Sequence, residues 1–386
     1  MSNPFSNLAS NVNPRTISPR QIAFVCAFLL PMGKLLEAPS ILAKYAKGDI
    51  LLPALLHFLL QTLVLIAVLW SASSSEYTLH ERLERVLGKG IYAVYIAYTL
   101  YFLFNVILPV LDFEKFVYAV FFDTAPTTFS FAVFFFFSAY VCTKGIKAIG
   151  RSADLCLFLF LLPFLALLIM AFAATDFSHL LPLFGTEFNS ALGGFTRTSP
   201  HFSDVALLLP LLFHCRFKKN DGVKIVTGYW TGCFFTALFL ATFYAVYSSI
   251  APREHYAFSK IAQYFPALSV IGRFDLIFVY LLSVVLLFYT CMPLQYATGL
   301  IARTIRIKRK TWISAAVNSA LFIAILFWNK NYDSFYSVIS GKLFFVFWIF
   351  STLLPTFLLL LPKNPKQKSK PKTAAEKRIK EEAEHA

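Results

Sequence analysis

Two short segments of this sequence carry groups that could bind a charged small molecule. The first segment interrupts a long apolar run, and the second opens another such run. Their distinctive residues are Gly33, Lys34, Glu37, His201, Ser203 and Asp204. Amides exposed at the start of a half-helix bind an anion such as a carboxylate, while freed carbonyls and surplus acidic charge receive an ammonium group. Together the segments would suit a zwitterion such as an amino acid.

Each of these residues also has an ordinary structural explanation. Lys34 and Glu37 are spaced i to i+3 and would neutralise each other on one helix face. Ser203 or Asp204 would serve as the N-cap of the helix that follows. An ionisable group at membrane depth is nevertheless costly, so it points to a site by default. We therefore expect Lys34, Glu37 and Asp204 to line a central cavity and to set its polarity.

The other polar residues inside apolar runs favour structural roles. His57 and Gln61 lie one helical turn apart, and Asn105 and Asn318 are isolated amides. Such groups more often form hydrogen bonds between membrane helices than bind ligands. We expect these four side chains to hold helices together.

Enzyme chemistry finds no support in the sequence. The patterns HExxH, GxSxG, the P-loop and the dinucleotide fingerprint do not occur, and the six cysteines lack metal-ligand spacing. His80 lies among alternating acids and arginines that are typical of a solvated amphipathic helix. Asp112 and Glu114 end an apolar run, where an outer vestibule and solvation at the interface explain them equally well. We expect no catalytic activity, no metal and no cofactor.

The composition of the chain indicates that the helices carrying these groups lie in a lipid bilayer. The chain has 386 residues, of which 58% are hydrophobic and only 14% charged, too little polar surface for a soluble globule of this size. A net charge of +15 could indicate nucleic acid, but the cations form short clusters between apolar runs. We expect a lipid partner and no nucleic acid.

The apolar runs predict about ten transmembrane helices. A hydrocarbon core about 30 Å thick takes about 20 helical residues. The candidate runs are Gln21–Tyr45 (interrupted), Ile50–Trp70, Ile91–Leu111, Thr127–Thr143, Leu155–Ala174, Phe202–Cys215, Val223–Ile250, Leu276–Ile301, Trp312–Trp328 and Leu343–Leu361. The predicted fold is therefore an all-α integral membrane domain over residues 21–361.

The first and sixth runs are predicted to be broken helices. Pro31 removes a backbone hydrogen bond, Gly33 weakens the helix, and Pro39 suits the first turn of a new one. The sixth run, of 14 residues, is too short to span and follows Gly193, Gly194 and Pro200. Breaks at positions one and six of ten suggest a five-plus-five inverted repeat with a binding site at its centre.

The distribution of cations predicts that both termini are cytoplasmic. With the N-terminus inside, the inner segments hold 25 Lys and Arg residues and the opposite loops hold 9. The densest inner loop runs from Arg303 to Lys310. Residues 1–20 are then a cytoplasmic N-terminal segment, and residues 362–386 a basic cytoplasmic tail that is either solvated or bound to anionic lipid.

Several short motifs together resemble the endospore germination permeases, which are the B subunits of nutrient germinant receptors. That family is a branch of the amino acid-polyamine-organocation transporter superfamily, whose fold is LeuT-like. The resemblance rests on the order and spacing of Ile17-Ser18-Pro19-Arg20-Gln21, Gly33, Pro39, Leu42-Ala43-Lys44, Gly48-Asp49, Leu180-Leu181-Pro182, Phe202-Ser203-Asp204 and Gly272-Arg273-Phe274-Asp275. It covers roughly residues 17 to 361. The charged pair Lys34 and Glu37 departs from the family pattern, as does the lack of glycine at the sixth break.

The resemblance implies a receptor subunit in the spore inner membrane that senses a small nutrient germinant, an amino acid by expectation, and triggers germination. Its implied partners are a receptor A subunit and a lipoprotein C subunit. Two other functions stay open, because both would use the same broken helices. One is an amino-acid transporter, and the other is an ion-conducting channel subunit that releases cations after the trigger.

Overall fold

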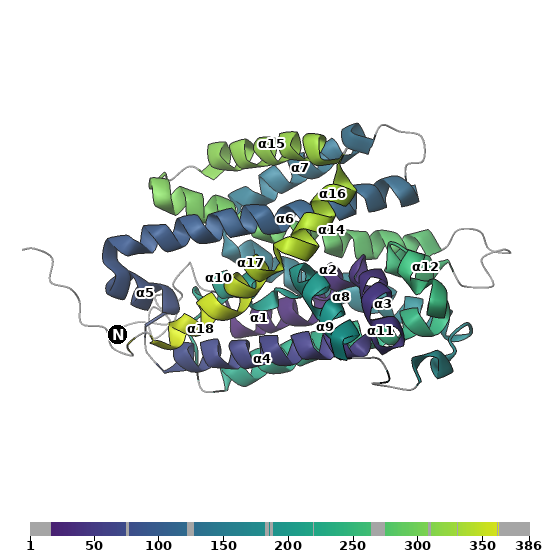
Figure 1. The fold of residues 1–386 in the computed structure, drawn as a ribbon. Helices are drawn as coiled ribbons and strands as arrows, with labels where there is room; N and C mark the ends of the chain where they lie inside the picture. Colours follow the sequence, from purple (N-terminus) through teal and green to yellow (C-terminus); the bar gives the residue numbers. More distant parts are fainter. Residues whose placement is uncertain are drawn as a thin grey trace, which may run out of the picture.

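In the part of the chain that the computed structural model describes, every regular element is helical (Figure 1). The structure describes residues 17–362 except 75–76, 122–126, 182–184, 186–187, 219, 264–274, 308–309, 330 and 361. Most of both predicted terminal segments lies outside these residues, as do Pro182 and most of the motif Gly272-Arg273-Phe274-Asp275. The predicted all-α class is confirmed.

Most of the predicted apolar runs correspond to long helices. These are α4 (Leu51–Ser73), α6 (Ile91–Phe121), α7 (Thr127–Thr143), α8 (Ile146–Phe172), α11 (Asp221–Tyr247), α14 (Asp275–Ile305) and α15 (Lys310–Asn329). The last run, Leu343–Leu361, consists of short helical pieces, namely α17 (Phe344–Trp348), η8 (Ile349–Leu353), α18 (Leu354–Thr356) and η9 (Phe357–Leu360). Two further pieces, α16 (Tyr332–Ser337) and η7 (Val338–Lys342), precede this run. Their apolar composition suits burial in lipid.

Six of the described helices are long and apolar enough to cross a membrane, and a seventh span results if one bent pair is counted. The bent pair joins Pro19–Leu35 to Ala38–Asp49 at an angle of 62°. Two further apolar helical stretches, Phe131–Thr143 and Phe344–Leu360, are shorter. The chain is therefore a membrane protein of many helices, while the count of ten stays a prediction.

The short pieces of the first and sixth runs lie side by side among the long helices. The first run consists of α1 (Pro19–Phe24), η1 (Val25–Leu29), α2 (Met32–Leu35) and α3 (Ala38–Ala46). The sixth run, Phe202–Cys215, contains α10 (Asp204–Leu212), and it is preceded by α9 (Phe188–Thr198) and η5 (Ser199–Phe202). Helix α3 packs on α9, α1 on α10 and α2 on η5, while α7 and α15 pair at one edge of the bundle (Figure 1).

Two short helices mark the opposite ends of the bundle and give the two sides their names here. Helix α5 (Leu79–Leu87) lies at the end where α4 finishes and α6 begins, and we call this the α5 side. Helix α12 (Ala257–Ala262) follows η6 (Ser248–Arg253) at the other end, which we call the α12 side (Figure 1). The predicted cytoplasmic face corresponds to the α5 side.

A pair of glycines one turn apart lets α11 approach the first broken helix closely. A Cβ at Gly228 would lie 2.5 Å from the carbonyl oxygen of Ala23, and a Cβ at Gly232 would lie 2.3 Å from that of Cys26. Small residues at this spacing allow membrane helices to pack backbone against backbone. The contact brings the next side chain, Tyr229, to the centre of the molecule.

Candidate functional site

The first break is sharpest at the end of the interruption predicted between Pro31 and Glu37. Backbone irregularity starts in η1, a π-helical turn, and passes through Pro31, but Gly33 itself lies within the helical turn α2. The sharp bend falls at Leu36 and Glu37. Two backbone carbonyls near this bend have hydrogen-bond partners within the protein. Ala257 N–H donates to Leu36 O at 2.9 Å, and His201 Nδ1 lies 3.3 Å from Gly33 O.

The sixth helix has a first half that hydropathy did not reveal. Helix α9, with the sequence FNSALGGFTRT, precedes the turn η5, and α10 begins at Asp204. The predicted short run was therefore only the second half of a broken helix. The first half is amphipathic and contains Arg197, so an apolar run could not mark it.

The side chain that bonds the start of α10 comes from another helix, α4. Ser203 occupies the N-cap position, but its side chain makes no capping bond. Gln61 of α4 supplies the cap, since its Oε1 accepts a hydrogen bond from Val205 N–H at 3.1 Å. Ser203 instead donates to Pro200 O at 3.3 Å and accepts from Asn105 Nδ2 at 3.3 Å. Ser203 therefore occupies the predicted N-cap position without forming a side-chain cap, and Asp204, the first residue of α10, is available for another contact.

A buried ion pair joins the two broken helices. Lys34 Nζ lies 2.6 Å from Asp204 Oδ1, and the two side chains are only 4% and 3% exposed. Lys34 also donates to Leu30 O at 3.3 Å, and its ammonium lies 5.5 Å from the centre of the Phe202 ring. Tyr229 donates its hydroxyl to Asp204 Oδ2 at 3.1 Å. The pair is therefore hydrogen-bonded on both sides, as a buried charge requires.

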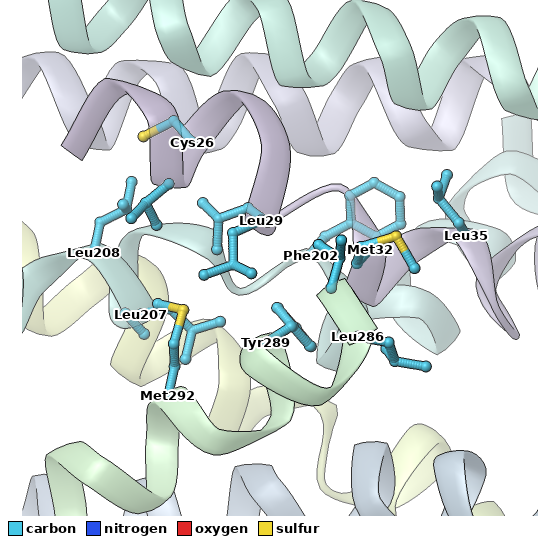
Figure 2. Packing of buried hydrophobic residues seen from close by; sticks show 14 of the residues in the cluster. Cys26, Leu29, Met32, Leu35, Phe202, Leu207, Leu208, Leu286, Tyr289 and Met292 are labelled. Carbon is cyan, nitrogen blue, oxygen red and sulfur yellow. The ribbon is translucent and has the colours of Figure 1, made fainter. Parts of the chain in front are cut away.

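The space around this ion pair is almost filled. The cavity beside it has a volume of about 10 Å³ and is lined by Cys26, Phe58, Tyr229 and Cys233 together with the pair itself. A cavity of this size holds about one water molecule. Figure 2 shows the apolar packing nearby, in which Leu29 and Met32, Phe202 and Leu207, and Tyr289 and Met292 come from three different parts of the chain.

Glu37 belongs to a separate pair on the α12 side. Its Oε2 lies 3.1 Å from His255 Nδ1, in the segment between η6 and α12. Lys34 and Glu37 therefore point to different partners, although three residues separate them. Lys34 and Asp204 meet beside one small cavity as expected, but Glu37 does not line that cavity, and the alternative of mutual neutralisation between Lys34 and Glu37 is not formed. The bend at Leu36 and Glu37 is the physical reason, because it ends the common helix face.

The remaining predicted residues hold the sixth helix in place. The His57 ring stacks on Phe195 and Phe202 with centroid distances of 4.0 and 4.5 Å, and its Nε2 lies 2.8 Å from Phe195 O. His201 Nε2 is buried and has no hydrogen-bond partner among the residues that the structure describes. The geometry of His57, Gln61 and Asn105 fits the interhelical bonding expected of them. Asn318 differs, since its amide donates to Ser314 O within its own helix.

Two neighbours of the central pair, Tyr229 and Tyr289, were not anticipated. Tyr229 is placed by the close approach at Gly228 and Gly232, and that spacing is the sequence signal that could have revealed it. Tyr289 packs with the hydroxyl end of its ring against the first helix, so a Cβ at Gly33 would lie 2.3 Å from the ring. Asp112 and Glu114 are buried within α6, which continues to Phe121, and do not end a helix as predicted.

Comparison with solved structures identifies the fold. The transporter MhsT, in a crystal structure with L-phenylalanine, superposes with a TM-score of 0.57 at 13% identity, covering 87% of this chain and 88% of that one. An inward-facing structure of Mhp1 matches with a TM-score of 0.41 at 11% identity, covering 90% of this chain and 76% of that one. The likeness to MhsT shows a LeuT-type transporter fold with broken first and sixth helices.

Comparison at the level of sequence assigns the family. No curated protein sequence matches the chain. The model of one protein family, described as spore germination protein, matches residues 16–334, which is most of the chain. The geometry of two broken helices joined at the centre of a transporter fold is consistent with that match, and the chain belongs to the spore germination permease family.

Proposed function

We propose that this chain is the B subunit of a nutrient germinant receptor, and that it senses an amino acid where its two broken helices meet. The ion pair between Lys34 and Asp204 carries the proposal. It is the one salt bridge with both side chains almost fully buried in the part of the chain that the structure describes. It also connects the two broken helices, which build the central binding site in folds of this kind.

The chemistry of the pair favours a zwitterion. A molecule with one ammonium and one carboxylate can replace the internal pair by two pairs, its ammonium on Asp204 and its carboxylate on Lys34. A simple cation would leave Lys34 unpaired, and a simple anion would leave Asp204 unpaired. Each unpaired charge costs at least about 2.5 kcal/mol at membrane depth. We therefore assign the α-amino acid itself as the recognised unit.

The small cavity supports a sensing role. An amino acid does not fit into about 10 Å³, so the two broken helices must separate before it can bind. A ligand that binds only the separated state shifts the protein towards that state. Gly33, His201 and Ser203 would line the opened site, and Glu37 would act through its contact with His255, which precedes α12. We propose that this shift is passed to an A subunit and a lipoprotein C subunit in the spore inner membrane, with both termini of this chain in the cytoplasm.

A ligand screen on the purified chain tests the proposal. In lipid nanodiscs, each of the twenty amino acids is added, and thermal unfolding is followed. At least one amino acid should raise the unfolding temperature, whereas its amide, which lacks the carboxylate, and its deamino acid, which lacks the ammonium, should not. A response to all three forms, or to none of the twenty amino acids, contradicts the assignment.

The likeness to a transporter supports a second candidate, which is uptake of the same amino acid. MhsT is a transporter-fold protein solved with L-phenylalanine. Uptake of the radiolabelled amino acid that responds in the screen, measured in proteoliposomes containing this chain alone, separates the candidates. Saturable accumulation favours the transporter, whereas binding without accumulation favours the receptor.

A further inference from the structure

A second cavity lies between α6, α10 and α14, away from the central ion pair. Its volume is about 70 Å³, and its walls are mainly apolar, with Tyr98 and Phe102 from α6, Leu209 from α10 and Leu300 from α14. None of its lining residues is shared with the cavity beside Lys34 and Asp204. A concave, mainly apolar space of this kind is a common form of small-molecule site.

The cavity opens towards a larger hollow on the α5 side. That hollow has a volume of about 490 Å³, and the two share His80, Tyr95, Phe213, His214 and Arg303. Among these shared residues, Arg303 carries the permanent charge. Lys144 and Lys310 line the smaller cavity, whereas Arg216, Glu81 and Glu84 line the larger hollow. A charged group of a ligand placed at this opening would therefore be an anion.

Arg303 is held at the opening without a neutralising acid. Its guanidinium donates a hydrogen bond to His214 Nε2, and His214 Nδ1 donates to Pro210 O at 2.8 Å. Both nitrogens of His214 are thereby used by a neutral ring. Within the described residues Arg303 forms no salt bridge, and a guanidinium has five N–H donors. Donors remain free for a carboxylate.

The inner end of the cavity holds a polar atom that needs a partner. Tyr296 is buried, its ring packs 5.2 Å from that of Phe102, and its hydroxyl has no hydrogen-bond partner among the residues that the structure describes. A buried polar group of this kind is commonly satisfied by a water molecule or a ligand. Gly299, one turn further along α14, faces open space, since a Cβ there would meet no atom within 4 Å.

We propose that this cavity binds a short-chain carboxylate whose far end carries a hydroxyl or carbonyl group. Arg303 binds the carboxylate at the opening, the apolar walls hold the chain, and Tyr296 bonds the polar atom at the inner end. The volume is about half that of the ~150 Å³ cavity that holds benzene in another protein, so the enclosed body is about three to five carbons long. This site is separate from the amino-acid site and does not depend on it.

Equilibrium binding of two carboxylates tests the assignment. Radiolabelled hexanoate and 6-hydroxyhexanoate are titrated onto the purified chain in phosphatidylcholine nanodiscs, with hexylammonium as the charge control. Saturable binding of both acids and none of the amine is expected, with the hydroxy acid binding about tenfold more tightly. Tyr296→Phe should remove that preference while leaving hexanoate binding unchanged.

A variant that fills the cavity distinguishes binding at this site from non-specific uptake into lipid. Gly299→Leu should weaken both acids at least about tenfold, whereas Gly193→Leu, also at a helical glycine with open space around it, should change neither. Arg303→Lys should retain more binding than Arg303→Gln. Absence of saturable binding, or equal binding by Gly299→Leu, overturns the proposal. Complete displacement of hexanoate in nanodiscs containing phosphatidylglycerol would show that a lipid occupies the cavity and would likewise overturn it.

Discussion

The two ion pairs made from the first broken helix lie in very different surroundings. Lys34 and Asp204 are 4% and 3% exposed, whereas His255, the partner of Glu37, is 63% exposed. The inner pair joins the two broken helices, and the outer pair joins the first broken helix to the segment before α12. A bend of 62° separates these environments within three residues.

The difference shows how one helix break can serve two purposes. A buried pair gains little net free energy but is costly to leave half-paired, because each charge has lost its water. An exposed pair is weak, is screened by salt, and changes with protonation. We therefore assign ligand recognition to the inner pair and a weaker, pH-dependent closure of the α12 side to the outer pair.

Loss of one partner of the inner pair should have the largest effect. Lys34→Met leaves the Asp204 carboxylate buried with only the Tyr229 hydroxyl, and should lower the free energy of unfolding by about 3–5 kcal/mol. The double variant Lys34→Met/Asp204→Leu should lose less than Lys34→Met alone. Unfolding in mixed micelles measures these values. Lys260→Met, which breaks the more exposed contact between Lys260 and Glu254, is the control and should cost below about 1 kcal/mol. A double variant that loses the sum of both single losses would contradict the account.

Crowding the first break should have the next largest effect. A Cβ at Gly33 would lie 2.3 Å from the Tyr289 ring, so Gly33→Ala should destabilise by about 1–3 kcal/mol through overpacking. Shortening the opposing ring in Gly33→Ala/Tyr289→Leu should recover part of the loss. Gly299→Ala, on a helix with open space at the Cβ position, is the matched control and should not destabilise. Equal stability of the two alanine variants would show that Tyr289 does not press on this break.

Removal of the cap on α10 should weaken the support of Asp204. Gln61→Leu keeps the approximate volume but leaves the buried Val205 N–H without its acceptor, at a cost of about 1–3 kcal/mol. Asn318→Leu is the control, because the Asn318 amide donates to Ser314 O in the middle of its own helix and caps no helix start. Thermal unfolding of both variants checks the prediction, which fails if the two lose the same stability.

The outer pair should give a small effect that depends on pH. The hydrogen bond to Glu37 raises the pKa of His255, burial opposes it, Glu254 adds to the rise and Lys115 opposes it. Because the pKa in the folded protein is raised, the stabilisation is full below the unfolded value of about 6.5 and is lost as the pH rises through the folded value. For such an exposed group we expect below about 1 kcal/mol after screening. Unfolding temperatures measured between pH 5.5 and 8.5 should show this gain in stability at low pH in the parent chain and not in His255→Asn. Parallel curves for the two proteins would show that the outer pair does not stabilise the fold.

Sequence reasoning predicted the fold class and both breaks because composition and proline placement are local signals. Pro31, Gly33 and Pro39 indicated the first break, and Asp204 stood out as an acid beside a short apolar helix. The sequence did not reveal which acid forms the ion pair with Lys34. Glu37 lies three residues away and Asp204 lies 170 residues away, and it is the bend that turns Glu37 away from Lys34.

Amphipathic and tertiary features were missed for a related reason. Helix α9 contains Asn189, Arg197 and two glycines, so it did not register as part of a membrane helix. The cap from Gln61 and the hydroxyl of Tyr229 depend on contacts between distant helices. The glycine pair at 228 and 232 was a readable signal of close packing, but it does not reveal which helix approaches.

The affinity of the recognised amino acid for Asp204→Asn tests the central claim most directly. Binding of that amino acid to the purified parent chain, to Asp204→Asn and to the outer-pair control His255→Asn is measured at equal protein concentration, with folded protein confirmed by size-exclusion chromatography. We expect binding to weaken at least about tenfold in Asp204→Asn, or about 1.4 kcal/mol, and to change less than about threefold in His255→Asn. Unchanged affinity in folded Asp204→Asn would contradict the exchange of the inner ion pair for the ligand.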